Sequence, residues 1–239
     1  ELRDVLLKEL KERKMEGIYL DIEIKLARIL AGMEKNGLRI DVAFLEKLSA
    51  GIEKKIKAAE KKIFEMSGAE FNINSPKQLG KVLFEDMGLP AGKKTKTGYS
   101  TNNEVLKELE GSFEIAGLIL KYRTLVKLKT GFLDVLCSFA AKDGIIHPAY
   151  NQTVTATGRL SSSNPNIQNI PIRGEEGREI RKAFVPLKDG EVLLKADYSQ
   201  VELRIMAHLA SDEKMTEAFK KGIDIHSLAA SRVFGVDVK

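Results

Sequence analysis

The residues with the clearest chemical potential form one run, Asp197-Tyr198-Ser199-Gln200-Val201-Glu202. The apolar triplet Val192-Leu193-Leu194 precedes this run, and a helix-like apolar pattern follows it. This order predicts a buried strand that ends at Asp197 and a helix that begins near Glu202. A carboxylate at such a junction can hold a hard cation against a phosphate. Taken alone, Asp197 is also compatible with a structural cap, and Glu202 with an ordinary acid at a helix N-terminus.

A second polar stretch, residues 155–171, concentrates amides, hydroxyls and one arginine and lacks acidic residues. Such side chains can contact phosphates and base edges, and Asn and Gln can donate hydrogen bonds to the minor-groove acceptors of every base pair. The alternative is a polar surface loop with a turn at Asn164-Pro165. Composition alone leaves both interpretations open.

The net charge of +5 is a weak indication of a nucleic-acid partner, and the distribution of cations adds to it. Basic residues gather in a Gly/Thr/Ser-rich loop and recur along one predicted helix. They are Lys93, Lys94 and Lys96 in the loop, and Lys121, Arg123, Lys127 and Lys129 in the helix. Solvated surface lysines would give a similar pattern.

The sequence also restricts the class of protein. No apolar run approaches the roughly 20 residues that span a bilayer, and the N-terminal residues Glu-Leu-Arg do not form a signal peptide. The single Cys137 cannot form an internal disulfide, which favours a reducing, cytosolic setting. Because residue 1 is not Met, we expect this end to be a cut rather than a natural start.

Two long helices are predicted to form an antiparallel arm. Asp41 is a good N-cap for the first helix, which Ser67-Gly68 ends, and the second is expected over residues 113–140. The first helix carries apolar residues at three- and four-residue steps, the spacing that pairs one helix with another. These residues are Leu45, Leu48, Ile52, Ile56, Ala59, Ile63 and Met66. Short helices, capped by Ser75 and by Asn102 or Asn103, are expected between the two.

The predicted secondary structure changes from helical to extended after the second long helix. Short extended pieces are predicted at residues 145–147, 150–155 and 192–198, with the irregular polar stretch between them. The fold class that follows is α+β and mostly helical: a long antiparallel helical arm, then a body with a small antiparallel sheet.

Several stretches together resemble bacterial family A DNA polymerases, the DNA polymerase I type. In the body these are residues 155–171, Gly177-Arg178-Glu179-Ile180-Arg181-Lys182-Ala183-Phe184, residues 196–209 and Asp224-Ile225-His226. In the arm, Ser75-Pro76-Lys77-Gln78-Leu79 and residues 121–129 resemble the thumb of that family. The likeness runs in one collinear order over nearly the whole chain.

The resemblance implies a division of the chain and an activity. Residues 1–36 would be the tail of an upstream exonuclease-like domain with a connecting helix, and residues 37–142 the helical thumb. Residues 143–222 would be the N-terminal part of the palm with the first metal-binding motif, and residues 223–239 the start of the fingers. The implied activity is template-directed transfer of deoxynucleotides to a primer 3′-hydroxyl by a two-metal mechanism. The implied partners are primer–template DNA and dNTPs, with no membrane and a monomeric enzyme in the bacterial nucleoid.

The resemblance also assigns roles to residues around the first run. Asp197, Glu202 and Arg204 form the implied catalytic set, with Asp197 and the Tyr198 carbonyl binding two Mg²⁺ ions in the complete enzyme. Glu202 resembles the steric gate that excludes a 2′-hydroxyl. Gln200, Glu202 and His226 are the implied nucleotide-binding residues. Without the resemblance, Arg204 would be a helix-surface cation and His226 a structural histidine.

The implied DNA contacts lie in the polar stretch and the arm. Arg159 resembles an arginine that reaches the minor groove at the primer terminus. Asn166, Gln168 and Asn169 resemble residues near the duplex or template, and Arg123 and Lys127 resemble phosphate contacts of the thumb.

The family's main fingers helix and the second palm aspartate, which lies in a His-Asp-Glu motif, are not found in this sequence. We therefore expect the isolated chain to be inactive as a polymerase. A non-catalytic primer–template-binding module is the alternative. A helical interaction protein would explain the long apolar stripe but not the composition of residues 158–171.

Overall fold

A computed structural model describes residues 2–91, 94–95, 98–171, 174–188 and 190–235. Lys93 and Lys96 of the predicted basic loop lie outside the described residues. The chain divides into two compact units, Glu1–Val192 and Leu193–Lys239, and each is described by itself. The predicted fold class is confirmed, since the chain is mostly helical with small antiparallel sheets. None of the described helices is long and apolar enough to cross a membrane.

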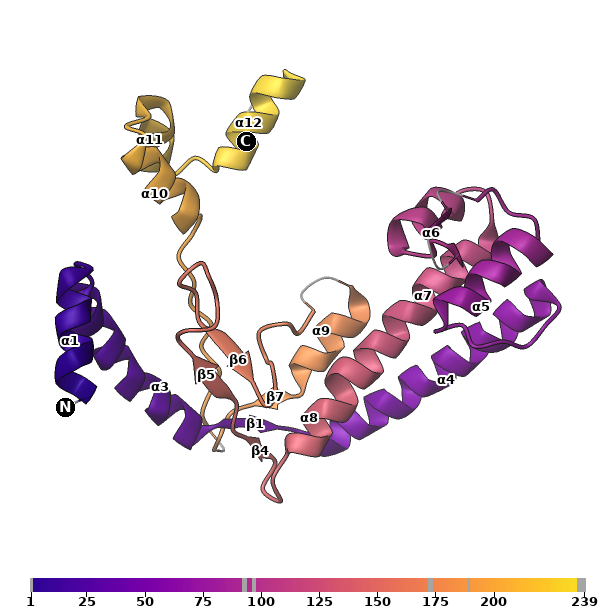
Figure 1. Ribbon diagram of the computed structural model, residues 1–239, viewed down its shortest axis with the longest axis horizontal. Helices are drawn as coiled ribbons and strands as arrows, with labels where there is room; N and C mark the ends of the chain where they lie inside the picture. Colours follow the sequence, from indigo (N-terminus) through magenta and orange to yellow (C-terminus); the bar gives the residue numbers. More distant parts are fainter. Residues whose placement is uncertain (1, 92–93, 96–97, 172–173, 189, 236–239) are drawn as a thin grey trace. The chain divides into compact units, whose positions relative to one another are not determined.

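The first unit contains a helical N-terminal segment, the arm and three small sheets (Figure 1). Its α-helices are α1 (Leu2–Glu12), α2 (Glu16–Ile18), α3 (Ile24–Asn36), α4 (Val42–Ser67), α5 (Pro76–Lys81), α6 (Asn103–Glu110), α7 (Glu114–Leu128), α8 (Asp134–Phe139) and α9 (Glu175–Lys182). The π-helical turns are η1 (Tyr19–Glu23), η2 (Val82–Asp86) and η3 (Lys129–Leu133). The strands are β1 (Leu38–Ile40), β2 (Lys94–Thr95), β3 (Gly98–Tyr99), β4 (Ile145–Ile146), β5 (Ala149–Asn151), β6 (Ser161–Ser163) and β7 (Phe184–Val185).

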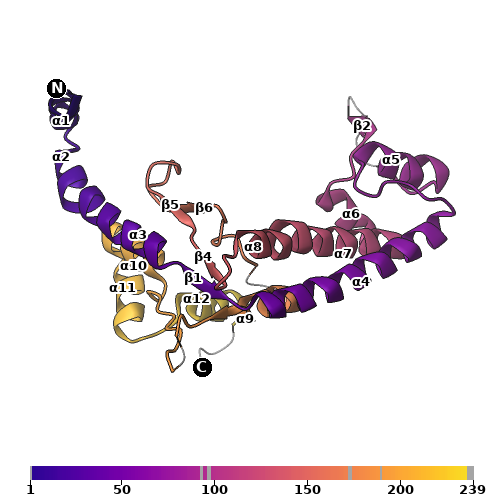
Figure 2. The ribbon, with the colours of Figure 1, turned by 90° about the horizontal axis from the view of Figure 1, so that it is seen from below.

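The arm is built from α4 and the continuous helix formed by α7, η3 and α8, which lie side by side (Figure 1; Figure 2). The apolar stripe of α4 is confirmed. Its buried members are Leu45, Ile52, Ile56, Ala59 and Ile63, and Leu48 and Met66 pack partly buried against the same core. The facing helix contributes Ile115, Ile119, Tyr122, Leu125 and Leu128 to this core. Burial of these two stripes against each other is the main source of stability in the arm.

The predicted helix caps are also confirmed. Asp41 Oδ1 accepts a hydrogen bond from Phe44 N at 2.9 Å, and α4 ends at Gly68, whose φ of 70° is left-handed. The side chain of Ser75 caps α5, with Pro76 as its first residue. Of the two candidate asparagines, Asn102 is the cap of α6, and its Oδ1 accepts from Val105 N at 3.0 Å. Each cap satisfies a backbone N–H that the helix itself leaves without a partner.

A three-stranded antiparallel sheet in the order β4-β1-β7 lies where α3 passes into α4. Arg39, at the centre of β1, is paired with Ile145 on one side and with Val185 on the other. This sheet joins segments that lie more than a hundred residues apart, and it fixes the start of the arm to the segment that follows it.

Gly37 links α3 to β1 at φ 67° and ψ −167°, a backbone region essentially restricted to glycine. A Cβ at this position would lie 2.6 Å from both Ile145 Cγ2 and the Ile146 carbonyl oxygen. Gly37→Ala is therefore expected to lower the free energy of unfolding by about 3 kcal/mol, measured by urea denaturation.

Gly68→Ala is the matched control for this substitution. Gly68 also has a positive φ, of 70°, but no atom lies within 4 Å of a Cβ built there. Backbone strain alone should cost about 1 kcal/mol. Equal losses in the two variants would show that the close approach at Gly37 has no energetic role.

The strand predictions need two corrections. The extended piece at residues 150–155 is shorter, because β5 ends at Asn151, and its partner β6 lies within the stretch predicted to be irregular. The predicted strand at residues 192–198 does not form. Val192 and Leu194 are 85% and 89% exposed, and this segment has no strand partner among the described residues. A strand needs a neighbour for its backbone hydrogen bonds, and an apolar sequence does not supply one.

The second unit consists of an extended segment followed by α10 (Val201–Leu209), α11 (Glu213–Lys220) and α12 (Ile225–Phe234). The predicted helix after residue 200 is confirmed as α10. Asp212 and Asp224 are the N-caps of α11 and α12. Ala207 and Ala218 are the buried apolar residues between α10 and α11, so this packing contact is small.

Candidate nucleic-acid interface and metal-binding turn

The polar stretch of the first unit begins in the connection between β5 and β6. These strands pair antiparallel, with Tyr150 opposite Ser162, and the connection carries Arg159. Thr155 Oγ1 donates a hydrogen bond to the Arg159 carbonyl at 2.5 Å, and this bond closes the turn formed by residues 155–159. The Arg159 side chain is exposed, as a contact to a large ligand requires.

A buried serine organises the second half of the stretch. Ser162 is only 4% exposed, and its Oγ accepts hydrogen bonds from Ile167 N at 3.1 Å and Gln168 N at 3.4 Å. The same hydroxyl lies 3.1 Å from Asn166 Oδ1, to which it donates. Asn166, Gln168 and Asn169 are all exposed around this centre. This role of Ser162 was not predicted, because three consecutive serines in β6 give no sequence signal of which one is buried.

The end of the stretch is fixed to α9. Arg181 donates from Nη2 to the Ile170 carbonyl and from Nε to the Pro171 carbonyl, both at 3.2 Å. Gly177 approaches the same segment so closely that a Cβ would lie 2.8 Å from Pro171 Cβ. Contacts at both ends therefore hold the three exposed amides in one region of the surface.

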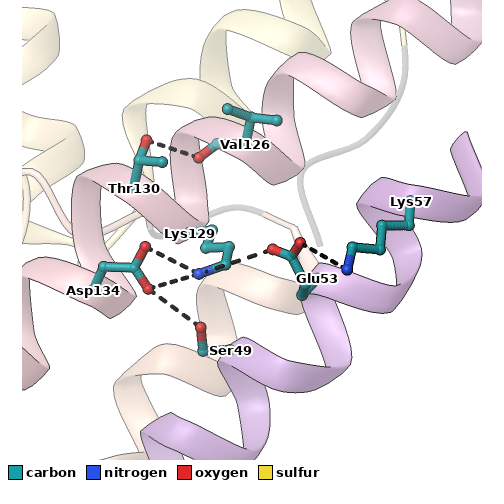
Figure 3. A network of polar contacts seen from close by, with 7 residues as sticks. All are labelled: Ser49, Glu53, Lys57, Val126, Lys129, Thr130 and Asp134. Carbon is teal, nitrogen blue, oxygen red and sulfur yellow. Dashed lines mark hydrogen bonds and ion pairs between the residues drawn. The ribbon is translucent and has the colours of Figure 1, made fainter. Parts of the chain in front are cut away.

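The cations of the arm fall into two environments. Lys121 and Lys127 are exposed on α7. Arg123 is half-buried, and burial lowers the pKa of its guanidinium from the usual value. Lys129 is also half-buried and lies in a network with acids of α4 and α8 (Figure 3).

Asp197 and Tyr198 precede α10 in an exposed segment of the second unit. Gln200 follows in the left-handed region, with φ 52°, and turns the chain into the helix. Arg204 Nε donates to the Ser199 carbonyl at 2.9 Å, and its guanidinium carbon lies 4.5 Å from the centroid of the Phe219 ring on α11. The described contacts of Arg204 therefore hold the turn between Tyr198 and Val201.

Asp224 connects this turn to the helix that carries His226. One carboxylate oxygen accepts a hydrogen bond from Gln200 Nε2, and the other accepts from Ser227 N at 2.8 Å as the cap of α12. The backbone hydrogen bond from Ser227 is the main reason why the pKa of Asp224 is lowered, and the nearby His226 acts in the same direction. Glu202 and His226 are exposed at the first turns of α10 and α12. Neither the N-cap role of Asp224 nor its hydrogen bond with Gln200, 24 residues away in the sequence, was predicted from the sequence.

The turn at Asp197 offers few ligands for a Mg²⁺ ion. The described residues contain no group of three or more His, Cys, Asp or Glu side chains that could hold a metal. Mg²⁺ commonly takes only one or two protein carboxylates and completes its shell with water and substrate phosphates. The exposed carboxylate of Asp197 and the adjacent Tyr198 carbonyl fit that chemistry as a partial anchor.

Most of this chain is similar to proteins of one known family. A family model described as DNA polymerase family A matches residues 42–239. DNA polymerase I of Lactococcus lactis is 48% identical over 98% of this chain and 27% of its own length, and DNA polymerase I of Geobacillus stearothermophilus is 47% identical with the same coverage. The chain thus spans about a quarter of the length of these curated relatives.

A solved structure extends the match to the fold. The POL domain of Pol1 from M. smegmatis, in complex with DNA primer-template and dNTP, superposes with a TM-score of 0.88 at 42% identity. The match covers 98% of this chain and 42% of that one. The family model matches residues 42–239, the relatives and the solved structure each cover 98% of the chain, and the chain therefore belongs to DNA polymerase family A.

Proposed function

We propose that the full-length protein is a template-directed DNA polymerase that adds deoxynucleotides to the 3′-hydroxyl of a primer. The observation that carries the proposal is the collinear match of the whole chain to a polymerase domain solved with DNA primer-template and dNTP. The polar stretch and the turn at Asp197 fall within residues 42–239, which the family model matches. The enzyme is proposed to act as a monomer on DNA in the bacterial nucleoid.

The DNA contacts are assigned to exposed side chains of the first unit. Lys127 binds a phosphate, and Arg159 reaches the minor groove at the primer terminus. Asn166, Gln168 and Asn169 donate hydrogen bonds to groove acceptors that all base pairs share. The hydrogen bonds that join Ser162 to Asn166 and to the Gln168 backbone support this role, since they hold exposed amides in place and an enzyme that copies any sequence needs contacts independent of sequence.

The nucleotide and metal contacts are assigned to the second unit. Asp197 and the Tyr198 carbonyl hold Mg²⁺, which when bound activates the primer hydroxyl and neutralises charge on the leaving pyrophosphate. Gln200 and His226 contact the incoming nucleotide, and Glu202 places its bulk beside the sugar. The hydrogen bond between Gln200 and Asp224 supports a joint role for Gln200 and His226, because it ties the turn that carries Gln200 to α12, the helix that carries His226. Arg204 orients the turn through the Ser199 carbonyl.

A non-catalytic module that holds primer–template DNA is the second candidate. The observation in its favour is that the described residues contain no group of three or more His, Cys, Asp or Glu side chains that could hold a metal, so that Asp197 is the only carboxylate assigned to the proposed site. Both candidates require the chain to bind DNA. They differ in whether the full-length protein incorporates nucleotides.

The test uses the 239-residue chain and a fluorescent primer–template duplex. The chain should bind the duplex with an affinity that falls steeply as salt rises, because released counterions drive phosphate contacts. With Mg²⁺ and dNTPs the chain alone should not extend the primer, whereas the full-length protein should. Failure of the chain to bind duplex even at low salt would contradict both candidates, and incorporation by the chain alone would contradict the requirement for the second aspartate.

A further inference from the structure

The basic side chains of the α7–η3 helix differ in how they are used inside the protein. Lys121, Arg123, Lys127 and Lys129 recur along this helix, and each could bind a phosphate by charge alone. A phosphate contact needs donors that face solvent, whereas a cation with its donors on internal acceptors has few left for a ligand. The surroundings of Arg123 and Lys129 therefore decide whether they share the role of Lys127.

The guanidinium of Arg123 is directed into the protein. Its Nη1 donates to the Thr101 carbonyl at 2.5 Å and to Asn103 Oδ1 at 3.4 Å, and its Nη2 donates to Thr101 Oγ1 at 3.4 Å. Thr101 is only 4% exposed, so this contact is shielded from water. The planar fork of the guanidinium matches two oxygens of one residue in a way that a lysine cannot.

The acceptors of Arg123 belong to residues 99–103, which lie at the tip of the arm and are called the tip segment below (Figure 1). Asn102, between them, is the N-cap of α6, and Tyr99 just before them packs on Phe84 with ring centroids 5.2 Å apart. A Cβ on Gly80 of α5 would lie 3.3 Å from the Tyr99 carbonyl oxygen, which shows how closely the two backbones approach. Arg123 thus ties the tip segment, already packed on α5 and η2, to α7.

Lys129 makes the corresponding link where η3 begins. Its Nζ lies 2.9 Å and 3.0 Å from the two carboxylate oxygens of Asp134 and 3.9 Å from Glu53 Oε2 on α4. Figure 3 shows the lysine between these acids, with Ser49 of α4 bonded to Asp134 and Lys57 paired with Glu53. Its side chain is 22% exposed. The network joins α4 to the two ends of the π-helical turn.

We propose that Arg123 and Lys129 are positioning residues that hold the tip of the arm and the η3 turn in place, and that neither binds DNA phosphate. Of the four basic residues, the exposed Lys121 and Lys127 remain for phosphate contacts, and Lys127 is the one to which the proposed function gives that role. The inference rests on the proposed DNA binding, and it replaces the phosphate role predicted for Arg123 from the sequence. Substitution of Arg123 would change where the tip lies rather than how many counterions DNA binding releases.

The salt dependence of DNA binding separates the two roles. For duplex DNA the slope of log K against log[salt] changes by about 0.9 for each phosphate that the protein no longer neutralises. Lys127→Met should reduce the slope by about that amount. Arg123→Met and Lys129→Met should leave the slope unchanged, although the affinity falls. A slope reduced by about 0.9 in either of these two variants would overturn the assignment for that residue.

Hydrogen exchange of the DNA-free chain gives an independent measurement. Arg123→Met should speed exchange at Val105 and Leu106, whose N–H groups bond to Asn102, and Lys129→Met should do so in η3 and α8. Arg123→Lys keeps the charge and should fold, yet it should not restore protection at α6. Restored protection in Arg123→Lys would contradict the need for the fork. If the wild-type chain failed to bind DNA, the proposed function would fail while these exchange results still tested the positioning roles.

Discussion

Asp197→Ala in the full-length protein is expected to reduce single-turnover nucleotide incorporation by at least about a thousandfold. The carboxylate is the charged group assigned to holding Mg²⁺, and the described residues form no group of three or more His, Cys, Asp or Glu side chains that could hold a metal in its place. Affinity for primer–template DNA should change by less than about twofold, since neutralised phosphates dominate that affinity and Asp197 is an acid. Rapid-quench kinetics and a fluorescence titration measure the two quantities.

Glu213→Gln is the matched control for Asp197→Ala. Glu213 is an exposed acid of the same unit, in the first turn of α11, and the proposal gives it no part in metal binding. Its substitution should leave incorporation nearly unchanged. A comparable fall in incorporation in both variants would mean that acidity of the unit in general, and not the Asp197 carboxylate, is what matters.

Glu202→Ala is expected to relax the choice between deoxynucleotides and ribonucleotides by about a hundredfold. Glu202 is exposed in the first turn of α10, next to the turn that carries Asp197 and Tyr198. If its bulk excludes the 2′-hydroxyl, a methyl group in its place removes the obstruction. The ratio of kcat/KM for dNTP and rNTP opposite the same template base measures the effect.

Glu202→Gln separates bulk from charge at this position. Glutamine has nearly the volume of glutamate without its charge, so this variant should keep most of the sugar discrimination. Equal relaxation in the Gln and Ala variants would show that charge makes the selection. Unchanged discrimination in Glu202→Ala would remove the steric role altogether.

The features predictable from the sequence are those that depend on neighbouring residues. The caps at Asp41, Ser75 and Asn102 and the stripe of α4 follow from local chemistry and helical spacing, and all are present. The strand at residues 192–198 fails because its hydrogen bonds would have to come from a distant strand. The strands β1, β2, β3, β6 and β7 were also missed, since each has three or fewer residues and none stands out as an extended apolar piece, as the equally short β4 and β5 did.

In the candidate site, too, properties set by neighbouring residues could be predicted from the sequence, whereas contacts between distant residues could not. The exposure of Arg159 and of the amides around Asn166 agrees with a surface that could contact DNA. The contacts of Arg123 with Thr101 join residues 22 positions apart, and no pattern near Arg123 indicates them. Arg123 and Lys127 were therefore predicted to share one role, although their side chains lie in different environments. A basic residue in a helix shows that a charge is available, but its partners are set by tertiary packing.

Single-nucleotide incorporation by the full-length protein on four primer–templates that differ only in the first template base tests whether the protein is a template-directed DNA polymerase. With Mg²⁺ and all four dNTPs, we expect each template to yield the complementary deoxynucleotide. Binding of all four duplexes without any incorporation, or addition of the same nucleotide whatever the template base, would contradict it.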